Sequence, residues 1–165
     1  MEIRPEQSGE EQAIHDLTQL AFATMPYSDG TEGPIIEALR KDGDLTLSLV
    51  AVEGDRIVGH VAFSPVTIEG RHDGWFGLGP ISVLPELQRR GIGKALISAG
   101  QDILRRRGAS GCALIGDPAY YSRVGFVSNG MLQYGELDRS LVQFIVYQGP
   151  QPQGSLKFAP GFGPT

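Results

Sequence analysis

The residues of this chain that are best suited to chemistry form a glycine-rich turn. It reads Gln88-Arg89-Arg90-Gly91-Ile92-Gly93-Lys94 and lies between an apolar segment and an amphipathic one. A turn that opens directly into a helix presents free backbone N–H groups and the positive end of the helix dipole. Because Gly91 and Gly93 have no Cβ, a phosphate can approach the main chain closely. The turn therefore predicts a pyrophosphate site at the start of a helix.

Two widespread phosphate-binding loops do not fit this turn. A Walker A loop requires glycine at the position of Gln88 and serine or threonine at that of Ala95. A dinucleotide fingerprint requires a third glycine where Leu96 stands. What remains is the pattern Gln-x-x-Gly-x-Gly after a strand. The alternative interpretation of this pattern is an ordinary loop with glycine at a helix start.

A second pattern follows the apolar run Cys112–Ile115. It consists of the turn Asp117-Pro118, the pair Tyr120-Tyr121 and, after the spacing Tyr-x-x-x-Gly-Phe, Gly125-Phe126. The two patterns together resemble the acetyl-CoA loop and the next block of the GCN5-related N-acetyltransferase (GNAT) superfamily. With the segment Gly59–Pro65, the chain is most similar to the YhbS-type branch. The resemblance extends from the first strand to Phe126 and continues more weakly beyond.

This resemblance implies a fold, a co-substrate and a set of site residues. The fold is α/β, a mixed central sheet with antiparallel N-terminal strands and a splayed parallel pair at its centre, flanked by helices. The co-substrate is acetyl-CoA, whose pantetheine arm lies where the parallel pair diverges. Pro80 fits this arrangement because proline cannot donate a ladder hydrogen bond. The implied cofactor-binding residues are Ile81, Ser82, Val83, Gln88, Arg89, Arg90, Gly91, Ile92, Gly93, Lys94 and Tyr121.

The tyrosine pair supplies the proposed general acid. A tyrosine stays protonated at neutral pH and can donate a proton to the departing CoA thiolate. Successive helical residues diverge by about 100°, so only one of the two rings can readily face the cofactor. The motif spacing selects Tyr121 and leaves Tyr120 to pack or to line the acceptor pocket. The alternative is that both are structural aromatics.

The general base is not identified by the sequence. The predicted strand 75–83 carries no acidic residue, although many members of the superfamily have a glutamate there. Asp117, Glu32 and His60 are candidates, with Asp117 preferred. His60 fits equally a packed polar residue of the sheet, and Glu32 a solvated or capping residue. Ordered water is an equal alternative to any of them.

The elements that would position these residues follow from the periodicity. Strands are expected at 2–4, 45–52, 57–68, 75–83, 111–115 and 141–147, with a hairpin at 53–56 and a further strand opening at Gly125-Phe126. Ser8 and Glu11 match a capping box before a first helix, and a second helix is expected at 35–41. The main helix, up to Arg107, has one apolar face: Ile92, Ala95, Leu96, Ala99 and Ile103.

The composition limits the functional class. The chain has 165 residues, is 41% hydrophobic and carries a net charge of −5, which suits one domain without a nucleic-acid surface. No Cys/His cluster has metal spacing, so no metal is predicted. A single cysteine, no long apolar stretch and no signal region favour the cytoplasm, without a membrane partner. The expected partners are acetyl-CoA and an amine acceptor, with a homodimer left open.

The chain is expected to form one N-acetyltransferase domain at 1–148 and a tail at 149–165. Glycine and proline dominate the tail, which predicts irregular or disordered structure. The segment 154–158 also matches a short closing strand of this branch, which would pack the tail on the domain.

The predicted function is transfer of an acetyl group from acetyl-CoA to a primary amine, of a small molecule or a protein, by direct attack in a ternary complex. The segment 22–33 and the late strands would form the acceptor pocket. The alternative function is a non-catalytic acyl-CoA binding or sensing module. A nucleotide-binding protein comes third.

Overall fold

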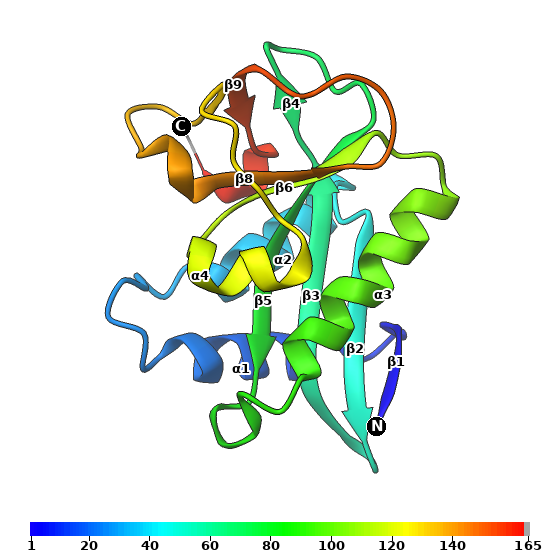
Figure 1. Ribbon diagram of the computed structural model, residues 1–165. Coiled ribbons are helices and arrows are strands. Elements are labelled where there is room, and N and C mark those ends of the chain that lie inside the picture. Colours follow the sequence, from blue (N-terminus) through cyan, green and yellow to red (C-terminus); the bar gives the residue numbers. More distant parts are fainter. Residues whose placement is uncertain (164–165) are drawn as a thin grey trace.

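The computed structural model describes residues 1–163, which form a central sheet between layers of helices (Figure 1). The main sheet has the strand order β1-β2-β3-β5-β6-β8. Neighbouring strands are antiparallel except β5 and β6, which are parallel. This mixed sheet confirms the predicted fold class. Its strands are β1 (Glu2–Pro5), β2 (Leu47–Glu53), β3 (Arg56–Pro65), β5 (Trp75–Val83), β6 (Gly111–Ile115) and β8 (Val142–Val146).

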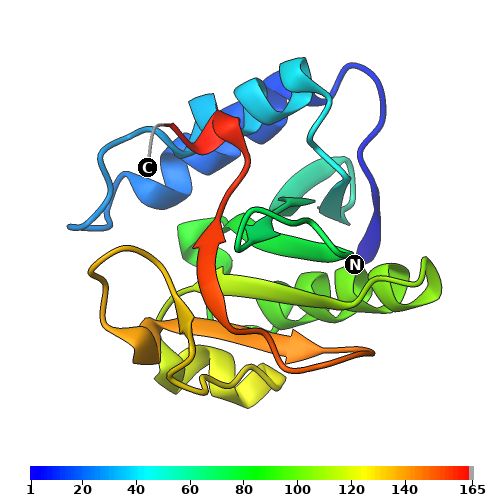
Figure 2. The same cartoon turned by 90° about the horizontal axis from the view of Figure 1, so that it is seen from above.

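Helices cover both faces of this sheet (Figure 2). Helices α1 (Glu11–Phe22) and α2 (Glu32–Asp42) lie on one face, where Ile14 and Ile36 pack with Val50 of β2. Helix α3 (Ile92–Arg106) lies on the other, and a Cβ added to Gly59 of β3 would meet its first residue at 3.0 Å. Beside it is the short helix α4 (Pro118–Tyr121). None of the helices within residues 1–163 is long and apolar enough to cross a membrane.

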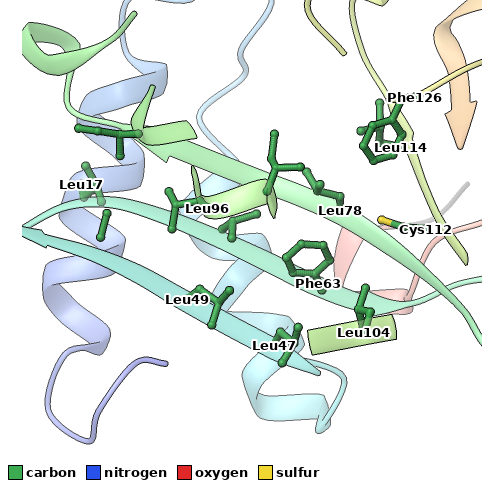
Figure 3. Packing of buried hydrophobic residues seen from close by; sticks show 14 of the residues in the cluster. Leu17, Leu47, Leu49, Phe63, Leu78, Leu96, Leu104, Cys112, Leu114 and Phe126 are labelled. Atoms are coloured by element: carbon green, nitrogen blue, oxygen red, sulfur yellow. The ribbon is translucent and has the colours of Figure 1, made fainter. Parts of the chain in front are cut away.

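The main hydrophobic core lies between the sheet and α3 (Figure 3). Leu96 and Leu104 of α3 are fully buried there, against strand residues such as Phe63. The buried face of this helix is rotated about the helix axis relative to the apolar face that the sequence predicted. Gly100 is buried because the Phe63 ring occupies the space that a Cβ would need. Ala95, Ala99 and Ile103 are only half-buried, whereas Ile97 is fully buried.

A second, smaller sheet includes the C-terminal segment. Its order is β4-β9-β7, with β4 (Thr67–Ile68), β9 (Gly154–Lys157) and β7 (Leu132–Gln133). The glycine and proline content predicted irregular structure here, but β9 pairs antiparallel with β4 and parallel with β7. Leu156 is 2% exposed and packs with Val66 and Trp75, which explains why this segment is ordered. A one-turn helix, Pro160–Phe162, then contacts α2. The last two residues of the predicted tail lie outside the described range.

The predicted capping box at the start of α1 does not form. The helix begins at Glu11 with Glu10 as its N-cap, not with Ser8. The Glu10 carboxylate instead accepts the Gln7 N–H and two hydrogen bonds from Arg4 at 2.7 and 2.9 Å. A charge-assisted, bidentate arginine pair is stronger than a neutral serine cap, and here the Arg4–Glu10 pair forms while the serine cap does not.

One predicted strand does not form in the described chain, and another is divided in two. Gly125-Phe126 opens no strand in the described chain, where only an isolated bridge joins Val127 to Phe144. The chain turns at Gly125, whose φ is +95°, and the Phe126 side chain is buried in the main hydrophobic core. The strand expected at 57–68 is divided into β3 and β4 after Pro65, where proline interrupts the ladder.

Candidate active site

The parallel strands β5 and β6 pair over a short distance and then diverge. Within residues 1–163, β5 pairs with β6 only at Trp75, Phe76 and Gly77. From Leu78 to Val83, β5 stays paired with β3 while β6 continues against β8. We call this segment of β5, residues 78–83, the splay. The family resemblance implied this divergence, and Pro80 predicted interrupted pairing in the middle of the strand.

A bulge marks the start of the splay. The β3–β5 register changes between Phe63, opposite Leu78, and Val61, opposite Ile81. Two residues of β5, Gly79 and Pro80, therefore lie opposite a single residue of β3. A bulge of this kind bends its strand and strengthens the local twist, which carries β5 away from β6.

The main chain of the splay presents polar groups to the side that β6 has left. The Leu84 N–H donates to the Val58 carbonyl, which fixes the alternation of the antiparallel β3–β5 ladder. By that alternation Ser82 exchanges its hydrogen bonds with β3. The N–H and C=O groups of Ile81 and Val83 point away from β3. Of the three residues predicted to bind pantetheine through their main chain, these two have the required orientation.

The glycine-rich turn leads into α3 as predicted. Gly91 is the N-cap with a φ of +85°, and Arg89 also has a positive φ, of 65°. The first intrahelical hydrogen bond runs from the Ala95 N–H to the Gly91 carbonyl, so the three N–H groups of residues 92–94 have no intrahelical acceptor. Within the described chain, no side chain caps this end and no acidic residue occupies its first turn. These features are the ones that helix N-termini use when they bind anions.

The side chains of the turn have two different placements. Gln88 turns back to the splay, and its Nε2 donates to the Val83 carbonyl at 3.2 Å. Arg89, Arg90 and Lys94 are exposed around the turn. Gln88 thus ties the turn to β5, and the three cations are free to approach an anion.

Helix α4 follows β6 and carries the tyrosine pair. Asp117 is its N-cap, accepting the Ala119 N–H at 2.9 Å, and Pro118 occupies the first turn. The Asp117 carboxylate is therefore engaged as a helix cap. Capping of α4 is sufficient to explain the Asp117-Pro118 turn at the start of that helix.

Tyr121 lies inside the fold. Its ring fills the space beside Gly116 and makes an edge contact with Phe126 at a centroid distance of 5.9 Å. Burial raises the pKa of Tyr121 to about 12, and the nearby phenols of Tyr120 and Tyr27 add to this increase. The Tyr121 phenol is consequently protonated throughout the physiological pH range, as a proton donor needs to be.

Tyr120 takes a place that the sequence did not predict. Its hydroxyl lies 3.0 Å from the position that a Cβ would occupy at Gly93, in the first turn of α3. The side chains of Val83 and Ile81 lie 3.8 and 3.9 Å from the same position. Tyr120 therefore joins α4 to the glycine-rich turn beside the splay. Only the 100° divergence from Tyr121 hinted at a separate environment.

The other base candidates are also engaged. Glu32, in the first turn of α2, accepts the Ser28 hydroxyl at 2.7 Å. His60 is fully buried on β3, and burial followed by the charge of Arg40 lowers its pKa to about 3. His60 is therefore neutral at physiological pH. Among residues 1–163, no group of three or more His, Cys, Asp and Glu side chains could hold a metal ion.

Comparison with known proteins places this geometry among acetyltransferases. The model of the Acetyltransferase (GNAT) family matches residues 12–126. A GNAT family acetyltransferase from Brucella melitensis, solved in complex with acetyl-CoA, is 42% identical with a TM-score of 0.87, over 98% of this chain and 97% of that one. YhbS from Escherichia coli, solved with CoA, is 28% identical with a TM-score of 0.90, over 99% and 92%.

A curated relative gives the same result over a shorter span. The N-acetyltransferase YhbS of Escherichia coli K12, described as uncharacterized, is 38% identical over 107 residues. The match spans 64% of this chain and 64% of that relative.

Proposed function

Because the chain belongs to the acetyltransferase (GNAT) family, we propose that it transfers an acetyl group from acetyl-CoA to a primary amine. The amine belongs to a small molecule or to a protein or peptide, and it attacks directly within a ternary complex. The observation that carries this proposal is the splay beside an uncapped helix N-terminus. This pairing supplies main-chain groups for pantetheine and N–H groups for a pyrophosphate.

The proposed cofactor site extends from the turn to the tyrosines. The pyrophosphate accepts from the N–H groups at the start of α3, with Arg89, Arg90 and Lys94 balancing its charge. Pantetheine runs along the splay and pairs with the main chain of Ile81 and Val83. The pyrophosphate is placed at the start of α3 and the pantetheine along the splay because those segments carry the main-chain groups that each would bind.

The contact between Tyr120 and the Gly93 position gives Tyr120 a role beside the cofactor. We place its ring over the pantetheine arm, where it bridges α4 and the first turn of α3. We propose this role in place of lining the acceptor pocket, which was one of the two roles, with packing, expected from the sequence.

Tyr121 is the proposed general acid. When the amine attacks the thioester carbon, the C–S bond breaks and the sulfur leaves as a thiolate. The raised pKa of Tyr121 keeps its proton available at neutral pH for that thiolate. Direct attack needs no covalent enzyme intermediate, and the buried Cys112, whose pKa is raised by burial, is unsuited to be a nucleophile.

The acceptor is expected on the side of the segment between α1 and α2. Tyr27 in this segment is 78% exposed, yet it lies close enough to Tyr121 to raise its pKa. Asp29 is held by Thr31, whose hydroxyl and N–H it accepts, and Glu32 is held by Ser28. The two carboxylates are thus parts of local turns, and the acceptor class remains a primary amine. The buried free thiol of Cys112 suits the reducing cytoplasm that we propose as its compartment.

Calorimetric titration with acetyl-CoA, CoA and ATP tests the cofactor. We expect micromolar binding of both CoA species and none of ATP. Gly93→Val should weaken acetyl-CoA binding by about tenfold or more, because its side chain would fill the space between Tyr120 and the splay. Binding of ATP in place of acetyl-CoA would refute the proposal. Binding of acetyl-CoA without transfer to any amine of a broad panel would instead indicate the binding or sensing module.

A further inference from the structure

A line of polar side chains crosses the sheet on the face covered by α1 and α2. His60, fully buried on β3, has its Nε2 at 2.8 Å from the Ser48 hydroxyl on β2. The Ser48 hydroxyl donates to the Glu6 carboxylate. Glu6 in turn accepts two hydrogen bonds from Arg40 of α2, at 2.9 and 3.1 Å. Each polar group in this line touches the next.

The charge at one end of the line fixes the position of its protons. Glu6, paired with Arg40, is a carboxylate and can only accept hydrogen bonds. Ser48 donates its single O–H to Glu6, so the Ser48 oxygen must accept a hydrogen bond from His60 Nε2. The His60 ring therefore carries its proton on Nε2, and Nδ1 is a bare acceptor. This Nδ1 is buried and has no hydrogen-bond partner within the described chain.

Ser82 is the neighbouring residue that could donate to this acceptor. It lies directly opposite His60 in the β3–β5 register, so the two side chains share one face of the sheet. Its hydroxyl is also buried and without a partner among residues 1–163. The two atoms make no direct hydrogen bond. Because buried polar atoms are rarely left unsatisfied in proteins, two unpartnered groups on paired residues of one sheet face point to a bridging water between them. Ser82 lies in the splay, between the two residues whose main chain faces the cofactor side.

The other end of the line reaches the surface. Glu6, Arg40 and Ser48 line a hollow of about 430 Å³ that also includes Pro5 and Thr46. The line therefore connects the splay with solvent at a different part of the molecule. A bound cofactor and acceptor would block the direct route by which a proton could leave the splay for solvent. A second route through the sheet would still let the proton leave.

We propose that Ser82, His60, Ser48 and Glu6 form a proton exit path for the acetyl transfer, an inference that rests on the proposed function. The overall reaction converts an ammonium group and a thioester into an amide and a thiol, and it releases one proton. The amine proton passes through a water to the Ser82 oxygen, as the Ser82 proton moves through the bridging water to His60 Nδ1. The Nε2 proton moves to Ser48, the Ser48 proton moves to Glu6, and Glu6 releases it to solvent. This leaves the His60 proton on Nδ1, so the ring and the hydroxyls must reorient to restore the starting tautomer before the next turnover.

The burial of His60 determines how the proton travels. Its pKa is lowered to about 3, first by burial and then by Arg40, so an imidazolium does not accumulate at neutral pH. The ring accepts at one nitrogen while it donates at the other, and it stays neutral overall. His60 therefore relays the proton along the path and does not hold it as a protonated imidazolium. The three carboxyl and imidazole candidates of the sequence then need no direct contact with the amine.

The protonation of His60 can be measured without any acceptor. In ¹⁵N spectra of histidine-labelled protein, we expect the His60 proton on Nε2 and no titration between pH 8 and about 4. Ser82→Ala should shift the Nδ1 resonance, because it removes the donor. The Ser64 hydroxyl is likewise buried without a partner in the described chain, but lies outside this line, so Ser64→Ala is the matched control. A proton on Nδ1 would refute the path.

Kinetics with an amine from the panel give the second test. Ser82→Ala and His60→Gln should each lower kcat by about tenfold, with acetyl-CoA affinity within twofold of the wild type. The double variant should be no slower than either single variant, since one break interrupts the whole path. Ser64→Ala should keep the wild-type rate. Should His60→Gln not fold, Ser48→Ala breaks the path at its next step.

The outcomes separate this inference from the proposed function. Wild-type turnover with unchanged rates in Ser82→Ala and in the second variant would overturn the exit path and leave the acetyltransferase standing. A wild type that binds no acetyl-CoA would overturn the acetyltransferase, and the exit path with it. Reduced rates in the path variants and in Ser64→Ala alike would show a structural effect and also overturn the path.

Discussion

Gly93→Ala tests the position of Tyr120 at the start of α3. A Cβ at this residue would lie 3.0 Å from the Tyr120 hydroxyl, so the tyrosine must move by a few tenths of an ångström. The next neighbours, Val83 and Ile81, are at 3.8 and 3.9 Å, which are ordinary contacts. The Tyr120 hydroxyl is therefore the main obstacle to the added methyl group.

The size of the effect depends on the residue at position 120. Alanine is favoured over glycine in a helix by roughly 0.5–1 kcal/mol. With Tyr120 present, we expect the contact to offset this gain, so that the free energy of unfolding of Gly93→Ala stays within about 0.5 kcal/mol of the wild type. In a Tyr120→Phe background the hydroxyl is gone and the gain should appear. The coupling between the two positions should thus be about 0.5–1 kcal/mol.

Denaturant unfolding of the four proteins of this cycle measures the coupling. Gly100→Ala is the control in the same helix, because its Cβ would overlap the ring of the buried Phe63. We expect it to destabilise by about 1–3 kcal/mol whether residue 120 is Tyr or Phe. Additive effects of Gly93→Ala and Tyr120→Phe would refute the contact, and with it the proposed place of Tyr120 over the cofactor.

Three further predictions concern the acid, the cap and the N-terminal ion pair. Tyr121→Phe should lower kcat by about tenfold or more with little change in acetyl-CoA affinity, and unchanged turnover would refute its role as acid. Asp117→Ala should cost about 1 kcal/mol of stability through loss of the α4 cap, measured by thermal unfolding. A fall in kcat beyond the Tyr121→Phe effect would restore Asp117 as the base. The pairing with Arg4 lowers the pKa of Glu10 from 4.5 to about 2, so its contribution is present above pH 4.5 and is lost as pH falls towards 2. The stability difference between wild type and Glu10→Gln should shrink over that range, and a constant difference in acid titrations would contradict this.

Predictions from the sequence were most accurate where the backbone chemistry of a single residue type, proline or glycine, restricts the local structure. Pro80 lacks an N–H, so its position inside an apolar strand indicated a break in the ladder, and the splay begins beside it. Gly91 and Gly93 before an amphipathic segment indicated an open helix start, which the structure confirms. In both cases the backbone itself carried the information.

Predictions failed where distant residues compete for the same group. Ser8 and Glu11 match a local cap, but Arg4 binds Glu10 and moves the helix start. The composition of the tail predicted irregular structure, and only the family resemblance suggested the closing strand at 154–158, which forms as β9 because Leu156 packs in the second core.

The site residues found only in the structure have the same origin. The direction of the Tyr120 side chain depends on how a four-residue helix rests on α3, which no periodicity reports. The line from His60 to Glu6 joins residues separated by 54 positions in the chain, from 6 to 60, through side-chain contacts between β3, β2 and the residue after β1.

The splay has a consequence for how the protein is assembled. The sheet consists of two half-sheets, β1-β2-β3-β5 and β6-β8, which share only three paired positions. If pantetheine pairs with the main chain of Ile81 and Val83, the ligand substitutes for the missing stretch of strand. Cofactor binding then adds to the free energy of unfolding, and each turnover removes and replaces a component of the sheet. Such a domain would be a receptor whose scaffold is complete only when it is occupied.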